Sequence, residues 1–482
     1  MYVGAFPRHD YYDLNYENIE NDGDEDMEGS QPSAGTRRRS ALHELCHQCK
    51  TITFDDANDS EEDKMRISRE KAEIYNLARN ILRASHCSEN RNSWGHRFGH
   101  SLNNSLLTMY VADQTPLHIL CAQSNVDIQM ISILLEAVSL PSERRKATIR
   151  LPHLTSLLTS RSRHGCTPLH YLVGSCSADE MEELFSLMES MLKDEFNSLS
   201  VAREALKAAF LTFDSDMESP LHWALHEKMC AARFRILLKY SGIGALFEPN
   251  LSDEFPFDQF SRSCEEDLLV TQNEEVERTE ADNFRQFVEL LSVVMETSYH
   301  EEEKAGRGKI HPNKDSPPPQ IQPLHHLASY DYFPCPAYMF QLALRYHGDD
   351  IMVCDNSLRG RSPLHLALSA PQSTSRFLMR GHPIARSMNE ANIAMLLEHD
   401  PNCATSYSRE GRAPLHYAVE SQISIENIRR LLKIYPAALS VRDPLTDLHP
   451  MALAAVGENN TLDVVFELGR LEPSNFAVNW RR

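Results

Sequence analysis

Short apolar segments recur along the chain in one polar frame, and each is followed by a longer segment with helical periodicity. The frame reads Ser or Thr, then Pro, Leu and His, then an apolar residue and a small one. Five of the seven clear copies begin with Ser or Thr, and six carry Pro second. The copies are Ser40-Ala41-Leu42-His43, Thr115-Pro116-Leu117-His118, Thr167-Pro168-Leu169-His170, Ser219-Pro220-Leu221-His222, Gln322-Pro323-Leu324-His325, Ser362-Pro363-Leu364-His365 and Ala413-Pro414-Leu415-His416. Weaker copies occur at Phe255-Pro256-Phe257-Asp258 and His449-Pro450-Met451-Ala452.

Each copy suits the first turn of a helix. Ser or Thr caps free backbone N–H groups, and Pro at the first helical position gives up no hydrogen bond. Leu then points inward, and His can hydrogen-bond back toward the cap. The residues that follow, such as Ile119-Leu120-Cys121-Ala122, predict a short apolar helix whose small residues allow a close neighbour.

A second, amphipathic helix is predicted after a polar turn, and most copies of it carry a pair of leucines. These pairs are Leu134-Leu135, Leu237-Leu238, Leu290-Leu291, Leu396-Leu397 and Leu431-Leu432. The connectors that lead to the next copy are rich in turn formers, as in residues 355–360 and 409–412. Glycine there supplies the positive φ of a hairpin-like loop. Each unit is therefore predicted to be helix, turn, helix and loop.

This phrase and its helix pair resemble the ankyrin repeat, whose signature is Thr-Pro-Leu-His-x-Ala with a period near 33 residues. The resemblance covers residues 40 to 470. It implies an all-α fold, a helical solenoid of ankyrin type. It also implies that the chain recognises a protein partner on a concave face built from hairpin tips and first helices, and that it is not an enzyme.

The spacing departs from that period. Successive histidines lie 52 residues apart from His118 to His170 and again to His222, 40 from His325 to His365, and 51 from there to His416. We therefore expect insertions, as lengthened second helices or extended hairpin loops, for example at residues 181–206 and 372–388. Insertions in solenoids fall on loops, often on one face.

The chain is expected to divide as follows. Residues 1–39 form a disordered acidic tail, residues 40–110 a divergent first repeat with an inserted long charged helix, and residues 111–261 ankyrin repeats. Residues 262–320 form an acidic, Pro-rich insertion with one helix, residues 321–470 further ankyrin repeats, and residues 471–482 a C-terminal tail. Whether residues 240–300 are a true repeat, and whether the array forms one lobe or two, stay open.

Composition narrows the function classes. A formal net charge of −21 argues against a nucleic-acid groove and against binding to an anionic membrane surface. The N-terminus shows no secretory signal, and no apolar segment is long enough to span a bilayer. Eleven scattered cysteines are typical of free thiols in a reducing compartment. We expect a monomer in the cytoplasm or nucleus, without a cofactor.

Two clusters of histidine and cysteine residues are candidate metal sites. The segment His43-Glu44-Leu45-Cys46-His47-Gln48-Cys49 contains a C-x-x-C pair, but it aligns with residues 118–123 of the next copy, so we read it as repeat framework. His86, Cys87, His96 and His100 match no metal signature, and we read them as surface or loop residues. Neither cluster is predicted to bind zinc, and no glycine-rich phosphate loop is present.

Candidate binding and regulatory residues remain. Tyr171, Trp223 and Tyr417 directly follow the phrase histidine and are candidate partner contacts, with core packing as the competing interpretation. Ser40 follows three arginines and occupies a helix cap, which makes it a candidate phosphorylation site. The alternatives to a plain scaffold are a substrate adaptor that recruits a ubiquitin ligase or kinase through its tail or insertions, and an enzyme hidden in the insertions.

Overall fold

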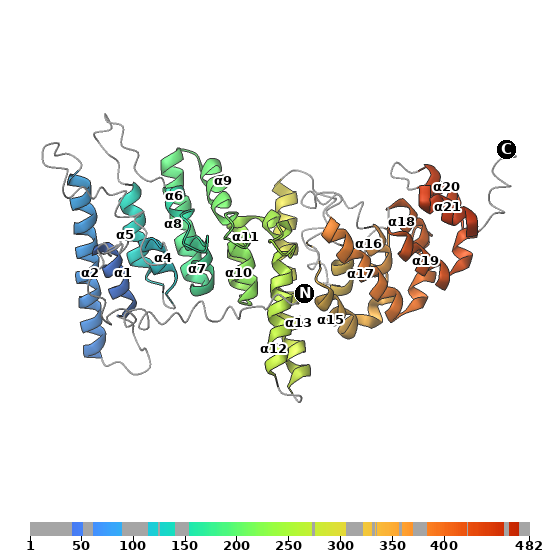
Figure 1. Ribbon diagram of the computed structural model, residues 1–482, viewed down its shortest axis with the longest axis horizontal. Helices are drawn as coiled ribbons and strands as arrows, with labels where there is room; N and C mark the ends of the chain where they lie inside the picture. The colour runs from blue at the N-terminus through green and yellow to red at the C-terminus, as the bar shows by residue number, and fades with distance from the viewer. Residues whose placement is uncertain are drawn as a thin grey trace, which may run out of the picture. The chain divides into compact units, whose positions relative to one another are not determined.

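The computed structural model describes residues 41–51, 61–88, 114–123, 126–139, 154–271, 275–304, 322–329, 333, 335–355, 359–369, 383–421, 423–456 and 462–471. Every regular element among them is a helix (Figure 1). The predicted all-α solenoid is confirmed, because helix pairs follow one another in sequence order and bury their apolar sides against the next pair. The expected tail at residues 1–39 lies outside the described residues, as do residues 472–482.

Eight of the nine first helices described begin at the proline of the repeated phrase or of its weak copies, and all of them except α1 and α12 are short. They are α1 (Ala41–Thr51), α4 (Pro116–Cys121), α7 (Pro168–Ser175), α10 (Pro220–His226), α12 (Pro256–Val270), α14 (Pro323–Ser329), α16 (Pro363–Ser369), α18 (Pro414–Glu420) and α20 (Pro450–Val456).

The second helices are mostly longer and amphipathic. They are α2 (Glu61–Ser88), α5 (Ile128–Ser139), α8 (Ala178–Phe196), α11 (Ala231–Ser241), α13 (Val276–Lys304), α15 (Ala337–His347), α17 (Pro383–His399), α19 (Ile425–Ile434) and α21 (Leu462–Leu471). Their paired leucines are buried, as the pattern predicts.

A third short helix ends most units and accounts for part of the long spacing. These helices are α6 (Leu154–Leu158), α9 (Leu199–Phe210), η4 (Ile243–Phe247), η5 (Gly348–Met352), η7 (Pro401–Thr405) and η8 (Pro436–Ser440). The extra length expected at residues 181–206 is thus divided between a long α8 and a separate helix α9, joined at Asn197 with φ 52°. Of residues 372–388, only 383–388 are described, and they begin α17.

The helices pack in two rows. In the first row, α1 contacts α4, followed by α7, α10 and α12; a second run leads from α14 through α16 and α18 to α20. In the row of second helices, contacts run without a break from α2 to α19. Between the two runs of first helices, α13 packs on α15, and the ring of Phe257 stacks on Phe333 with centroids 4.0 Å apart. Residues 39–482 accordingly form one compact unit.

The region expected as an insertion at 262–320 differs from that expectation. The boundary at 261 falls inside α12, and α12 and α13 form a helix pair that packs on α10 and α11. Phe255-Pro256-Phe257-Asp258 begins this pair as the phrase begins the others, with the carboxylate of Asp258 accepting from the Phe255 N–H at 2.8 Å. Asp258 stands where the other copies have His and serves as the capping acceptor, so this weaker copy of the phrase begins a helix as the clear copies do.

The long charged helix expected near residue 61 is also a member of the stack. It is α2, which packs on α1 and α5. Its Tyr75 hydroxyl donates to the carboxylate of Asp127 at 2.8 and 2.9 Å, and one oxygen of that carboxylate accepts from the Met130 N–H at the start of α5. The helix is therefore the second helix of the first pair.

Candidate functional site

The phrase histidine caps its own helix. In the second repeat the Thr115 backbone N–H donates to Nδ1 of His118 at 3.1 Å, and the Thr115 hydroxyl lies 2.8 Å from the same nitrogen. Because a backbone N–H can only donate, Nδ1 carries no proton and the ring proton sits on Nε2. That nitrogen lies 3.0 Å from the backbone carbonyl of Cys166, in the loop before the next repeat. One neutral imidazole thus connects a helix cap to the neighbouring repeat.

The same contact from the histidine to the following loop, which we call the histidine bridge, recurs along the stack. Nε2 of each phrase histidine lies within hydrogen-bonding distance of a carbonyl of the following loop. The pairs are His43 with Gln114 (3.4 Å), His118 with Cys166 (3.0 Å), His170 with Glu218 (3.0 Å), His222 with Glu254 (3.4 Å), His325 with Val353 (2.8 Å), His365 with Arg412 (3.2 Å) and His416 with Val441 (3.0 Å). The histidine bonds back to the residue before the proline in five copies, where the backbone N–H of Thr115, Thr167, Ser219, Ser362 or Ala413 donates to Nδ1.

Burial keeps these rings neutral. Desolvation lowers the pKa of His118, His170 and His365 to about 4, and it lowers the pKa of His325 and His416 as well. The carbonyl partner opposes this shift without reversing it. With Nδ1 occupied as an acceptor and Nε2 as a donor, the capping imidazoles have no nitrogen left to act as a general base.

Four of these accepting carbonyls also close a hairpin. The Ser162 N–H donates to Cys166 O at 2.8 Å, and the corresponding bonds join Asp214 to Glu218, Asn250 to Glu254 and Ser408 to Arg412. The residue before the closing position has positive φ, as the glycine pattern predicts for Gly165, Gly360 and Gly411. Met217, Asp253 and Asp447 adopt positive φ in the other hairpins, at 59°, 62° and 56°.

Neighbouring hairpins are bonded to one another through their backbones. We call the loops 162–166, 214–218, 250–254, 408–412 and 443–448, together with the described residues 355 and 359–361, the hairpin row. The Ser215 N–H donates to His164 O, and the Leu251 N–H donates to Asp216 O, each at 3.0 Å. Further along, the Arg409 N–H donates to Arg359 O at 3.0 Å. These bonds fix the hairpins at 162–166, 214–218 and 250–254 relative to one another, and they join the described residues 359–361 to the hairpin at 408–412.

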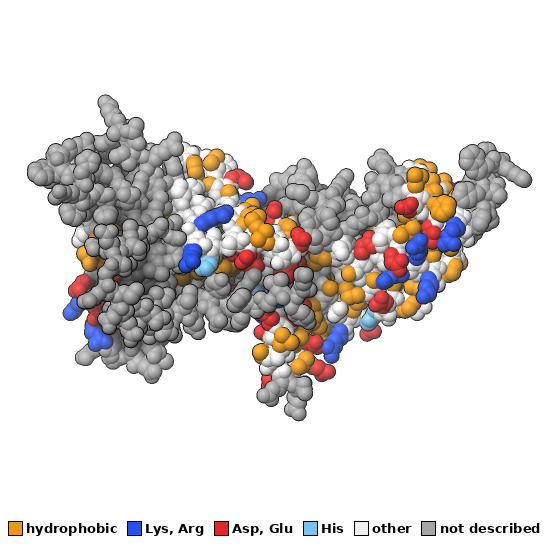
Figure 2. All heavy atoms as spheres, in the orientation of Figure 1, with side chains coloured by type: hydrophobic (Ala, Val, Ile, Leu, Met, Phe, Trp, Pro, Cys, Tyr) orange, Lys and Arg blue, Asp and Glu red, His pale blue; other side chains and the backbone are white. Residues whose placement is uncertain are grey.

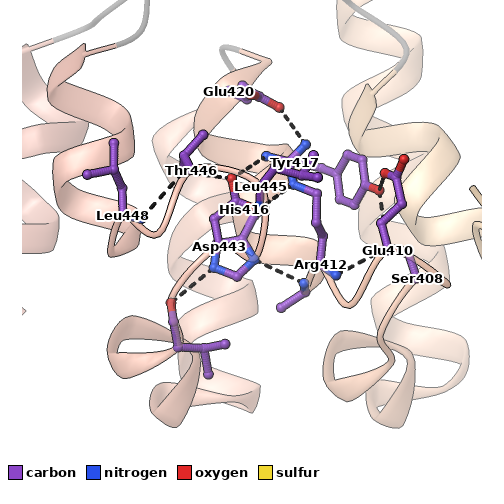
Figure 3. Close-up of polar contacts among 12 residues, drawn as sticks. Ser408, Glu410, Arg412, His416, Tyr417, Glu420, Asp443, Leu445, Thr446 and Leu448 are labelled. Carbon is purple, nitrogen blue, oxygen red and sulfur yellow. Dashed lines mark hydrogen bonds and ion pairs between the residues drawn. The ribbon is translucent and has the colours of Figure 1, made fainter.

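A buried ion pair joins the last two hairpins (Figure 3). The Arg412 guanidinium donates to both carboxylate oxygens of Asp443, from Nε at 2.8 Å and Nη2 at 3.4 Å, and its Nη1 donates to Glu420 at 2.9 Å. It also lies over the ring of Tyr417, 4.7 Å from the centroid. Asp443 is fully buried, and its Oδ2 accepts from the Thr446 hydroxyl at 2.9 Å.

The three candidate aromatic contacts fall into two groups. Tyr417 is 3% exposed, so it packs in the core and is not a surface contact. Tyr171 and Trp223 are half-buried on the first helices, and each packs edge-on against the phrase histidine of the preceding repeat, as Tyr417 does against His365. The Trp223 indole also donates to Asp214 at 3.1 Å. Tyr171 and Trp223 remain predicted partner contacts.

The remaining sequence candidates have these places. Cys46 and Cys49 are buried in α1, and burial raises the pKa of both thiols. No group of three or more potential metal ligands occurs among the described residues. Ser40, His96 and His100 lie outside the described residues, and only the backbone of His86 and Cys87 is described, as the end of α2.

Exposed side chains mark the tips of the hairpin row. Met217, Leu251 and Leu445 are exposed hydrophobic residues there, and Arg359 and Arg409 are exposed in the hairpins of the C-terminal half. Hydrophobic and charged side chains are interspersed over the visible surface (Figure 2). In the part of the chain that the structure describes, no helix is both long and apolar enough to cross a bilayer.

Comparison with known proteins adds little. No protein-family profile matches the sequence. No curated protein matches it either. Among solved structures, the chain is similar to a crystal structure of the ankyrin repeat domain of Bcl-3, described as a unique member of the IkappaB protein family, with 17% identity over 74% of this chain and 98% of that one and a TM-score of 0.21. At these values the likeness carries no functional argument, and the fold assignment depends on the helix pairs and hairpins described above.

Proposed function

We propose that this stack of ankyrin-like repeats is a protein-binding scaffold and that its partner docks on the hairpin row and the adjoining first helices. The observation that carries the proposal is the backbone bonding between neighbouring hairpins, through Ser215, Leu251 and Arg409. A surface whose tips are already ordered loses little conformational entropy when a partner binds.

The side chains along the row provide the contacts. Met217 and Leu251 present apolar surface, and Tyr171 and Trp223 lie half-buried on the adjoining helices. Aromatic anchors such as Tyr171 and Trp223 are the side chains that supply most of the binding energy at many protein interfaces. The acids at the N-terminal tips, Asp216 among them, suit a partner with basic groups opposite this part of the row.

The capping histidines and the most deeply buried cysteines support a structural role for these residues. The capping imidazoles are neutral and bonded at both nitrogens. Burial raises the pKa of Cys121 and Cys335 well above the ordinary thiol value, which makes them poor nucleophiles.

The test compares two sets of exposed substitutions in the full chain. Leu251→Ser with Leu445→Ser alters the row, whereas Val201→Ser with Leu77→Ser alters exposed positions of α9 and α2. Proximity labelling in cells followed by quantitative mass spectrometry should show a set of proteins that the row variant loses and the control retains. Equal labelling by both variants would show that the row is not the docking surface.

A further inference from the structure

The formal charge of the hairpin row changes sign along the chain. We call residues 214–218 and 248–254, which form two neighbouring hairpins, the acidic tips. They contain no lysine or arginine and six acids: Asp214, Asp216, Glu218, Glu248, Asp253 and Glu254. The preceding hairpin carries the exposed Arg163 instead, and Arg409 is exposed further along the row. Residues 154–271 are described without a gap, and both acidic hairpins lie inside this segment.

Three of the six carboxylates are occupied within the protein. Asp214 and Glu218 are buried, and Asp214 accepts from the Glu218 N–H at 2.8 Å. The carboxylate of Glu218 accepts from the Asn250 side-chain amide at 3.2 Å, which joins the two hairpins. Glu254 forms an ion pair with Arg262. These acids hold the acidic tips in place and are not available to a partner.

The other three carboxylates lie among exposed apolar side chains. Asp216, Glu248 and Asp253 are exposed, and within the described residues their carboxylates have no ion-pair or hydrogen-bonding partner. Leu251 is 67% exposed and Met217 41% exposed. Because the Leu251 N–H donates to the Asp216 carbonyl at 3.0 Å, these positions of the two hairpins are adjacent. The acidic tips therefore present apolar surface bordered by carboxylates that no cation neutralises.

A surface of this composition favours a segment that carries cations and apolar side chains together. Cations opposite the three exposed carboxylates attract them, and an acidic segment is repelled. Apolar side chains of the partner cover Leu251 and Met217 and remove their surface from water. A purely apolar segment would instead desolvate the carboxylates without a compensating partner, which costs free energy.

The packing of the stack sets the spacing of the cations. Helices α10 and α12, which follow the two hairpins, pack on each other. Packed helices lie about 8 to 10 Å apart, so neighbouring hairpins repeat at about that distance. An extended chain advances about 3.3 Å per residue. About every third residue of a segment that lies along the row therefore meets a new hairpin.

We propose that the acidic tips bind an extended segment of a partner protein in which Lys or Arg recurs about every third residue beside apolar side chains. The inference rests on the proposed docking function of the hairpin row and assigns the chemical class of its partner. Arg163 on the preceding hairpin disfavours a further cation there, so the basic part of the segment is short. Because the carboxylates are exposed, binding is sensitive to salt.

Fluorescence anisotropy with labelled synthetic peptides and the full chain tests the proposal. One probe repeats Lys-Leu-Ser four times, and its charge-reversed control repeats Glu-Leu-Ser. The Lys-Leu-Ser peptide should bind at least about tenfold more tightly in about 0.05 M salt than in about 0.5 M salt, where the Debye length is shorter. The Glu-Leu-Ser peptide should not bind.

Substitution of the exposed carboxylates locates the binding site. Asp216→Lys with Asp253→Asn should weaken binding of the Lys-Leu-Ser peptide at least about tenfold, because attraction is replaced by repulsion. Asn is chosen at position 253 since it tolerates the positive φ of 62° found there. The matched control is Asp194→Lys with Glu204→Gln, which changes the net charge equally at exposed positions of α8 and α9. Equal weakening by the two pairs would show attraction to net charge alone and overturn the proposal.

Substitution of the apolar surface gives a second readout. Leu251→Ser should also weaken binding of the Lys-Leu-Ser peptide, whereas Leu77→Ser, at an exposed position of α2, should leave it unchanged. All the substituted positions are exposed, so circular dichroism should show unchanged helix content. A Lys-Leu-Ser peptide that does not bind the unsubstituted chain refutes the inference.

Proximity labelling separates this inference from the proposed function. Proteins that are lost from Leu251→Ser with Leu445→Ser but retained by Asp216→Lys with Asp253→Asn would leave the hairpin row as the docking surface and exclude a basic partner. Proteins retained by both variants would count against the docking surface itself. Loss of the same proteins from both variants is the expected result.

Discussion

Nε2 of His170 lies 3.0 Å from the backbone carbonyl of Glu218, and that carbonyl also accepts the Asp214 N–H that closes the hairpin of the next repeat. A single oxygen therefore receives one hydrogen bond from within its own hairpin and one from the preceding helix cap. Each repeat is consequently stabilised by a hydrogen bond from the neighbouring repeat, in addition to the apolar contacts between helices. Such nearest-neighbour coupling is what makes a solenoid unfold in cooperative blocks.

Substituting His365 tests the strength of one bridge. His365→Leu leaves the Ser362 N–H and the Arg412 carbonyl without their imidazole partner in a buried place. Each lost partner costs about 1 to 3 kcal/mol, so the free energy of unfolding should fall by about 2 to 6 kcal/mol at pH 7. Urea denaturation followed by circular dichroism measures it. His399→Leu, at an exposed position of α17, is the control and should change little; equal losses from the two variants would argue against the bridge.

The loss of unfolding free energy caused by His365→Leu should become smaller as the pH is lowered. The pKa of His365 is lowered by burial to about 4, below the value of about 6.5 expected in the unfolded chain. Between these values the unfolded state binds the proton and the folded state does not. The contribution of neutral His365 to the free energy of unfolding is therefore fully present above pH 6.5. It decreases as the pH is lowered from 6.5 to 4 and stays constant below pH 4.

At pH 5 the unsubstituted protein should have lost about 2 kcal/mol through His365 alone. The destabilisation caused by His365→Leu should therefore be about 2 kcal/mol smaller at pH 5 than at pH 7. Because Asp214 and Asp258, whose pKa values burial raises to about 6, titrate in both proteins, the difference between the two chains isolates the histidine. A penalty independent of pH would show that the ring is not held neutral by burial.

Met217 offers a stabilising substitution. It adopts φ 59° at the hairpin position where Gly165 and Gly411 have φ 78° and 76°, and its side chain is exposed. A side chain in the left-handed region costs about 1 kcal/mol, so Met217→Gly should raise the free energy of unfolding by about that amount or slightly less. The reciprocal change Gly165→Ala should destabilise, because its Cβ would lie 2.6 Å from the Ser215 backbone nitrogen. Thermal unfolding of both variants gives the comparison, and a lower melting temperature for Met217→Gly would contradict it.

The sequence predicted those features that a local phrase determines. Ser or Thr, Pro, Leu and His in order predict a helix start, and the paired leucines predict a buried stripe; both are found, for example around Thr167 and at Leu237. Asp258 keeps the helix start without the Leu-His signature, so the sequence predicts only a weak copy there and an insertion from residue 262, and it leaves open whether residues 240–300 are a repeat. Asp258 accepts the same kind of hydrogen bond from the backbone that histidine accepts in the other copies.

The contacts across repeats were not predictable in the same way. Arg412 and Asp443 are 31 residues apart, and their pairing depends on two hairpins lying side by side. The burial of Tyr417 follows from the same neighbourhood, because Arg412 covers its ring. Both residues lie in connectors, where charged side chains are ordinarily exposed, so their local sequence did not predict their burial.

The Arg412–Asp443 pair yields a prediction about additivity. Arg412→Met leaves the fully buried Asp443 carboxylate without its cation, which should cost about 3 to 5 kcal/mol of unfolding free energy. Asp443→Asn removes that charge, and its amide oxygen can still accept from the Leu445 N–H while its NH2 group can donate to the Thr446 hydroxyl, in place of the two bonds that the carboxylate now accepts. The double variant should therefore lose less stability than the sum of the two single variants, because no isolated charge remains buried.

The exposed pair Arg442 and Asp447 is the matched control: Arg442→Met should cost less than about 1 kcal/mol. Urea titrations of all four variants complete the cycle, and losses that simply add would mean that the two side chains do not stabilise one another across the hairpins.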